Sequence, residues 1–260
     1  MNSNDAIKLS LLAGEILLSS GAETYRVEDT MRRLLINCGY IESEAFVVST
    51  GVFASITGTG EGKSRTAVKR ISKRTYDIER IIKVNDISRN FAEGKILIEG
   101  AISALEEVKS GAKIVNYPFV KIFASGMTCG CFTFMFGGSL PDCVNAFFTG
   151  IILQILTQQL NKIKVADALV NIIGGAVISF LALTFLNFGV GETLDYIIIG
   201  SLMLLVPGVT IVNAIRDVLE GDYLSGSSRI MDALIIALSI ACGVGVALKI
   251  WFQIFGGVII

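Results

Sequence analysis

Four polar side chains near the end of the chain recur at helical spacing. Separations of three, four and three residues place them on one face of a helix, and they are Thr210, Asn213, Asp217 and Glu220. A carboxylate in or near a membrane can take up a proton, and amides and hydroxyls can hydrogen-bond to a polar solute. This face could therefore carry protons or a small solute, with helix packing alone as the structural alternative.

A Pro-Gly pair lies just before this polar face, inside an apolar run that begins near Tyr196. At 1.5 Å per residue, Pro207 would lie about 17 Å from Tyr196, close to the middle of a bilayer. Because proline lacks an N–H and clashes with the carbonyl four residues back, the oxygen of Met203 loses its helical partner. Transporters use broken helices at this depth to offer backbone groups to a solute. We expect one kinked helix that carries both the break and the polar face.

Other charged and amide side chains in the apolar half could line the same path. Asp167 and Asn171 would share a face of one span, and Asp232 would begin another. Arg216 and Arg229 could contact a carboxylate of the solute. The candidate residues for a solute or proton path are Pro207, Gly208, Thr210, Asn213, Arg216, Asp217, Asp167, Asn171, Asp232 and Arg229.

A second polar group occurs early in the chain, in SGAETYRVEDTM. Gly21 is a typical helix stop, and Thr24 is the expected N-cap of the next helix. Capping leaves Glu23, Tyr25 and Arg26 unexplained. They form a compact polar group beside a turn, which could be a binding or docking site.

The composition argues against an enzyme, a metal site or a bound cofactor. Histidine is absent, and none of the five cysteines belongs to a C-x-x-C pair. GTGEGKS resembles a phosphate-binding loop but is one residue too short and precedes a strand-like segment, so it is expected to be a hairpin turn. An enzyme that acts through Glu23 and Arg26 is kept only as an alternative.

Charge divides the chain into two parts. Residues 1–113 contain 16 Lys and Arg and 15 Asp and Glu, whereas residues 114–260 contain six and eight. The first part is expected to be a small cytoplasmic α+β domain, with helices at Ala6–Ser19, Val27–Asn37, 77–93 and 97–110 and strands within 44–72. The second part is expected to be a transmembrane domain of five helices, so the fold class is an α-helical membrane protein.

The five expected spans are long enough to cross a bilayer. They are Tyr117–Phe136, Cys143–Leu160, Val165–Phe188, Tyr196–Ala214 and Ile230–Phe255. Basic residues lie at alternate span ends, namely Lys121, Lys162, Lys164, Arg216 and Arg229, and the opposite loops are acidic. Because cytoplasmic loops retain positive charge, the N-terminus is expected in the cytoplasm and the C-terminus outside it.

Two further patterns concern contacts. Small residues at four-residue spacing, such as Gly126 with Gly130, Gly175 with Ser179 and Ser239 with Gly243, predict close helix packing. A basic run is either the solvated face of a hairpin or a contact with an anionic lipid surface. Its members are Lys63, Arg65, Lys69, Arg70, Lys73 and Arg74. Nucleic acid is not an expected partner, since the domain is nearly neutral and the run lacks interleaved aromatics.

Two segments together carry a family resemblance. SGAETYRVEDTM and PGVTIVNAIRDVLEGDYLSGSSRIMDAL resemble the threonine/serine exporter family over essentially the whole chain. The motif positions are Gly21, Glu23, Tyr25, Arg26, Pro207, Gly208, Asn213, Arg216, Asp217, Gly221, Asp222, Gly226 and Arg229. The resemblance implies a secondary exporter of the inner membrane, driven by the proton-motive force, for threonine/serine-type amino acids or for C4-dicarboxylates.

The resemblance also implies a partner. Longer members continue into a second group of spans, so a separately encoded small multi-span membrane protein is expected. Assembly of several copies of this chain into a homo-oligomer is a further expectation. A scaffold that only stabilises the true transporter is the remaining alternative.

Overall fold

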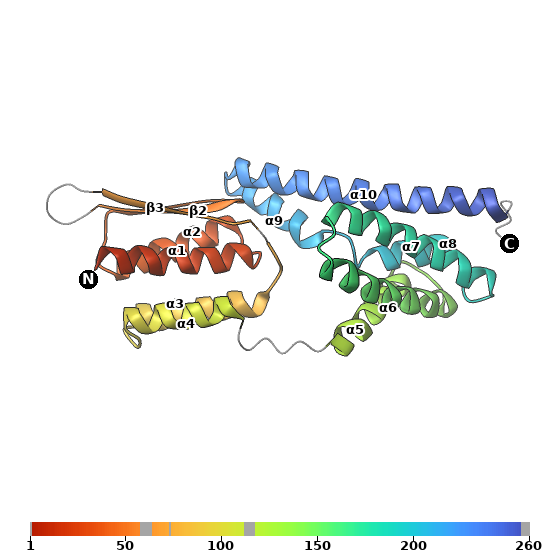
Figure 1. Ribbon diagram of the computed structural model, residues 1–260, viewed down its shortest axis with the longest axis horizontal. Helices are drawn as coiled ribbons and strands as arrows, with labels where there is room; N and C mark the ends of the chain where they lie inside the picture. The colour runs from red at the N-terminus through yellow and green to blue at the C-terminus, as the bar shows by residue number, and fades with distance from the viewer. Residues whose placement is uncertain (1, 58–63, 73, 112–117, 256–260) are drawn as a thin grey trace. The chain divides into compact units, whose positions relative to one another are not determined.

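The computed structural model describes residues 2–57, 64–72, 74–111 and 118–255 (Figure 1). Most of the expected turn GTGEGKS, together with Lys63 and Lys73 of the basic run, lies outside the described residues. The chain forms two compact units. The first contains Met1–Ile114 and Thr210–Ile230, and the second contains Val115–Val209 and Met231–Ile260.

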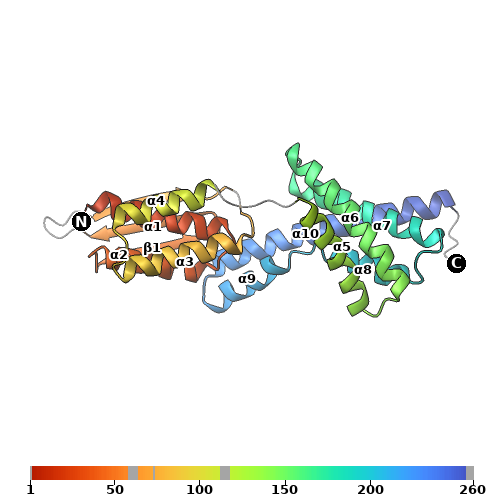
Figure 2. The same cartoon turned by 90° about the horizontal axis from the view of Figure 1, so that it is seen from below.

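The first unit has three layers (Figures 1 and 2). Its N-terminal segment forms α1 (Ser3–Ser19), α2 (Thr24–Asn37), β1 (Ser43–Val48), β2 (Gly51–Thr57), β3 (Ser64–Arg70), α3 (Ile78–Ala92) and α4 (Ile98–Ser110). An antiparallel sheet in the order β1-β2-β3 packs on α1 and α2, whose other side is covered by α3 and α4. These elements match the α+β expectation, and Gly21 and Gly39 end the first two helices at φ values of 87° and 91°.

The core of the first unit lies between the sheet and the first helix pair. Strand alternation directs Val47, Val52 and Ala54 inward, where they are fully buried. Leu9 of α1 and Met31 of α2 meet them from the helical side and are also fully buried. Each of the buried Val, Leu and Met side chains contributes about 1.5–3 kcal/mol through burial, so this core fixes the geometry of the α1–α2 turn.

The second unit is a helical bundle, and its long apolar helices identify the chain as a membrane protein. It contains α5 (Pro118–Met135), α6 (Leu140–Lys162), α7 (Asp167–Asn187), α8 (Leu194–Leu202) and most of α10 (Tyr223–Phe255). Among the described residues, α5, α6, α7 and α10 are long and apolar enough to cross a bilayer. They correspond to four of the five expected spans.

The prediction that the fourth span, Tyr196–Ala214, is a single kinked helix is wrong. α8 ends at Leu202, and α9 (Gly208–Leu219) starts only after a non-helical segment. The N–H groups of Leu205 and Val206 both donate to the carbonyl of Leu202, which closes a tight turn instead of continuing the helix. Pro207 has no N–H to continue the ladder. At nine residues α8 is about 14 Å long, too short to span a bilayer alone.

Small residues mediate close helix packing in the second unit, as predicted. A Cβ on Gly126 of α5 would lie 2.9 Å from the carbonyl oxygen of Phe147 on α6. A Cβ on Gly243 of α10 would lie 2.0 Å from the carbonyl oxygen of Ile172 on α7, and one on Gly175 would lie 2.7 Å from that of Ile240. Only glycine allows these backbones to approach so closely.

Candidate functional site

Two sequence-adjacent residues of α9 hold two sequence-adjacent residues at the start of α2. The Arg216 guanidinium donates a hydrogen bond to Glu23 Oε1. The Thr24 N–H donates to Asp217 Oδ1 at 3.3 Å. The two segments that carry the family resemblance therefore meet within the first unit, although 193 residues separate each bonded pair.

The start of α2 corrects the expected capping. Glu23, not Thr24, occupies the N-cap position, and its side chain makes no capping hydrogen bond. Thr24 is already the first helical residue, and its N–H is satisfied by Asp217. Because the N-terminus of a helix carries partial positive charge, a carboxylate from a distant segment can replace the missing cap.

A buried ion pair lies behind this contact. Arg229 Nε and Asp217 Oδ2 are 2.8 Å apart, and the two side chains are 2% and 0% exposed. Arg229 Nη2 also donates to the carbonyl of Ala22 at 3.2 Å. One guanidinium thus connects α10, α9 and the α1–α2 turn. Removal of either charge would leave the other uncompensated in a dry environment.

Further carboxylates lie near this pair. Glu28 Oε1 accepts the N–H of Val47 at 2.8 Å. Burial raises the pKa of the Glu28 carboxyl, the hydrogen bond from Val47 opposes the rise, and the charges of Asp222 and Asp217 add to it. Burial also raises the pKa of Asp217, against the attraction of Arg229 and the hydrogen bond from Thr24. The cluster is therefore a place where protonation and fold stability are coupled.

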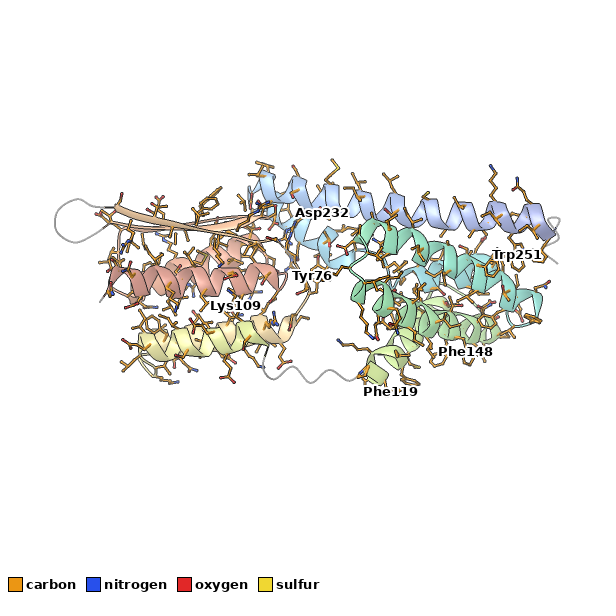
Figure 3. The ribbon with its side chains drawn as sticks, in the orientation of Figure 1. Tyr76, Lys109, Phe119, Phe148, Asp232 and Trp251 are labelled. Atoms are coloured by element: carbon orange, nitrogen blue, oxygen red, sulfur yellow. The ribbon has the colours of Figure 1, made fainter. Side chains whose placement is uncertain are left out.

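The polar face formed by Thr210, Asn213, Asp217 and Glu220 lies mostly against the α1–α2 turn. Asn213 Nδ2 donates to the carbonyl of Gly21 at 2.9 Å, and the hydroxyls of Thr210 and Tyr76 share a hydrogen bond. Figure 3 shows Tyr76 beside α9. Thr210, Asn213 and Asp217 are buried, whereas Glu220 is exposed. A solute or proton path along this face stays a prediction. Within the first unit, the contacts of the face are those of a surface packed against another part of the protein.

The start of α10 explains the GDYLSGSS portion of the second motif. Asp222 Oδ1 accepts the N–H of Ser225 at 3.1 Å and so caps α10. The Ser225 hydroxyl accepts the N–H of Ser49 at 3.1 Å, and the hydroxyls of Ser49 and Ser228 lie 3.1 Å apart. Gly221 has a φ of 88°, which turns the chain from α9 into α10. These residues bind the turn between β1 and β2.

The remaining predicted site residues lie elsewhere. Pro207 belongs to the segment between α8 and α9, and Gly208 is the first residue of α9. Asp167 and Asn171 are on α7. Asp232 is on α10 (Figure 3). Asp167 is exposed. These five residues all belong to the second unit.

Sequence reasoning missed a second polar group, inside the helical bundle. Asp142 Oδ1 accepts the N–H groups of Glu192 and Thr193, at 2.6 Å and 3.0 Å. Asn145 Nδ2 donates to the carbonyl of Val190 at 2.9 Å, and the Thr149 hydroxyl lies 3.3 Å from Asn145 Oδ1. Their spacing of three and four residues on α6 was the available signal. The group satisfies the backbone of the loop after α7, a structural task in an apolar setting.

Among the described residues, no group of three or more Cys, Asp or Glu side chains is arranged to hold a metal ion. In the carboxylate cluster, Arg229 is already the counter-charge of Asp217. The chemistry available there is ion pairing, proton uptake and binding of charged groups.

Comparisons with known proteins agree with the motifs. The model of a family described as "Putative threonine/serine exporter" matches residues 8–251. The "Probable succinate transporter subunit YjjP" of Klebsiella aerogenes is 26% identical over 94% of this chain and 93% of the relative. The threonine/serine exporter of Corynebacterium glutamicum is 22% identical over 94% of this chain, but only 51% of the relative.

A "Probable threonine/serine exporter" of Mycobacterium tuberculosis is 21% identical over 96% of this chain and 47% of the relative. The chain thus spans about half the length of the exporters it matches and nearly all of the succinate transporter subunit. No solved structure matches the chain significantly.

Proposed function

Because this chain belongs to the threonine/serine exporter family, we propose that it is a subunit of a secondary exporter of small polar metabolites. The supporting observation is that the two family motifs, far apart in sequence, meet in one buried polar cluster. Transport would be driven by the proton-motive force, since carboxylates in or near a membrane are suitable proton acceptors. An enzymatic role for the N-terminal segment is the weaker alternative.

The exported solute is either a threonine/serine-type amino acid or, as the alternative, a C4-dicarboxylate of the succinate type. Relatives named for each solute match at similar identity. Both solutes contain at least one carboxylate, so an arginine-bearing site suits either. Only a direct measurement with both solutes separates the two.

The partner in this proposal is a separately encoded, small multi-span membrane protein. The relative of the same length is named a subunit, and the exporters about twice as long would contain both halves in one chain. Assembly with a second copy of this chain is an additional arrangement. Contact of the basic run with anionic lipid stays a prediction, and within that run Arg65 donates to Ser3 Oγ and Lys69 pairs with Glu15.

The proposed location is the cytoplasmic (inner) membrane, with the N-terminal segment in the cytoplasm and the C-terminus outside. This arrangement requires the chain from α8 to α9 to cross the membrane in addition to the four apolar helices. Lys121 lies near the start of α5, Lys162 is the last residue of α6, and Lys164 follows that helix. The loops at the opposite helix ends carry acidic residues, among them Glu192 and Asp195. This asymmetry follows the retention of positive charge on the cytoplasmic side.

Deletion of the gene in its own host, where the native partner is present, tests the proposal. Cells loaded with labelled threonine, serine and succinate are followed for loss of each solute to the medium. We expect slower efflux of one class in the deletion strain and recovery when the chain is supplied from a plasmid. Equal efflux of all three solutes in both strains would reject the exporter role. Chemical conversion of a solute, without its release, would favour the enzyme alternative.

A further inference from the structure

Glu23 holds an arginine on each of its two carboxylate oxygens. Arg216 donates to Oε1, and Arg26 Nη1 lies 3.5 Å from Oε2. The Glu23 side chain is 11% exposed, while those of Arg26 and Arg216 are 57% and 54% exposed. A nearly buried carboxylate thus positions two guanidinium groups at the surface of the first unit.

The charge at this surface is positive. Two guanidinium groups face one carboxylate, and the N-terminus of α2 adds its partial positive charge at the N-cap residue Glu23. Two nearby acids are paired with other arginines: Asp217 pairs with Arg229, and Asp29 pairs with Arg33 on the next turn of α2. The arginines retain N–H donors that Glu23 does not use, because each guanidinium has five.

Planar guanidinium groups match carboxylates through paired N–H donors. Glu23 reduces the cost of binding further, since it holds both arginines in place before the ligand arrives. An amino acid would also need an acceptor for its ammonium group. The Glu23 side chain is only 11% exposed and its charge faces two guanidinium groups, so this site offers donors to an anion and little acceptor capacity to a cation.

We infer that Arg26 and Arg216, positioned by Glu23, form a binding site for a carboxylate group of the exported solute. The inference rests on the proposed function and narrows it, because the site takes a dicarboxylate in preference to a zwitterionic amino acid. An anionic lipid headgroup presents similar oxygens to arginine. The test therefore uses bilayers that contain neutral lipid only.

The test is calorimetric titration of the full chain in phosphatidylcholine nanodiscs with succinate and with L-threonine. We expect succinate to bind more tightly than threonine. Arg26→Gln should weaken succinate binding by about tenfold or more, the loss expected for charge-assisted hydrogen bonds. Arg33→Gln is the matched control on the same helix and should bind as the unchanged chain does. Arg26→Lys keeps the charge without the planar fork and should fall between the two.

Three results would overturn the inference: no succinate binding, tighter binding of threonine, or equal succinate binding by the Arg26→Gln and Arg33→Gln variants. Arg26→Gln leaves the Arg216–Glu23 contact in place, so a folded variant is expected and its melting temperature checks this. The efflux measurement in the deletion strain distinguishes failure of this carboxylate site from failure of the proposed exporter role. Slower efflux in the deletion strain without a carboxylate site in nanodiscs removes this inference alone, whereas nanodisc binding with unchanged efflux removes the exporter role.

Discussion

Asp217 and Arg229 form an ion pair, 2.8 Å between Oδ2 and Nε, in which neither side chain is more than 2% exposed. The same Asp217 accepts the N–H of Thr24, and the same Arg229 donates to the carbonyl of Ala22. The pair is therefore the centre of the contact between the two family motifs. Its replacement should affect the fold before it affects the handling of any solute.

Asp217→Asn should lower the stability of the first unit by about 3–5 kcal/mol, because it leaves a buried guanidinium without its counter-charge. Thermal unfolding of the full chain in detergent measures this. The sequence alone predicts that the same variant inserts but does not export. The structure adds that the loss of export should accompany a lower melting temperature.

Two variants serve as controls for Asp217→Asn. The double variant Asp217→Asn with Arg229→Met replaces the unpaired guanidinium by an apolar side chain of similar volume. It should recover part of the stability that Asp217→Asn loses. Glu220→Gln changes an exposed acid directly after the end of α9 and should have little effect. An Asp217→Asn protein as stable as the Glu220→Gln protein would show that the ion pair is not structural.

Glu28→Gln should change the pH dependence of stability. The Glu28 carboxyl has a pKa above its ordinary value of 4.5, so the folded state binds this proton more tightly than the unfolded state. The resulting stabilisation is complete below pH 4.5 and is lost as the pH rises through the raised pKa. The variant keeps an oxygen for the N–H of Val47 but does not titrate, so its melting temperature should fall less between pH 4.5 and neutrality.

Melting temperatures of the two proteins across that pH range measure the effect. Glu44→Gln, a change at an exposed position on β1, is the control and should follow the original chain. Parallel curves for the original chain and the Glu28→Gln variant would mean that Glu28 is not buried as described.

Gly243→Ala and Gly245→Ala separate packing from helix propensity within one helix. A Cβ at position 243 would lie 2.0 Å from the carbonyl oxygen of Ile172, whereas nothing lies within 4 Å of one at position 245. Overpacking costs about 1–3 kcal/mol, so Gly243→Ala should destabilise the bundle. Gly245→Ala should be neutral or slightly stabilising. Detergent unfolding that ranks the two variants equally would contradict the α7–α10 contact.

Gly21→Ala and Gly39→Ala form a second matched pair. Both glycines have positive φ, and each alanine should cost about 1–2 kcal/mol for that reason alone. A Cβ at position 21 would in addition lie 2.5 Å from the Tyr76 ring, while nothing lies within 4 Å of one at position 39. Gly21→Ala should therefore be the more destabilising in thermal unfolding. The reverse order would place Tyr76 elsewhere.

Local patterns in the sequence predicted the elements well. Helical spacing and glycine stops gave α1 to α4 close to their observed ends, and apolar length gave α5, α6, α7 and α10. Pro207 correctly marked a break. The prediction of a kink was too weak, because the chain is already non-helical after Leu202 and Pro207, next to Gly208, stands between two separate helices.

The candidate site was predictable in its members but not in its arrangement. Periodicity put Thr210, Asn213 and Asp217 on one face, yet it cannot say what that face contacts. The partner proved to be the turn at Gly21 to Thr24, across 193 residues of sequence in the case of Asp217 and Thr24. The same long-range contact explains the error at Thr24, where a local N-cap was expected and a distant carboxylate replaces it.

The polar face of α9 is docked against the α1–α2 turn and is closed to water. Single cysteines at positions 210, 213 and 220, in a chain whose five native cysteines are replaced, test it through labelling with a hydrophilic thiol reagent in the assembled membrane. We expect fast labelling at position 220 and slow labelling at positions 210 and 213. After denaturation the three labelling rates should be equal. Labelling at 213 as fast as at 220 in the folded protein would contradict it and indicate a water-filled path along this face.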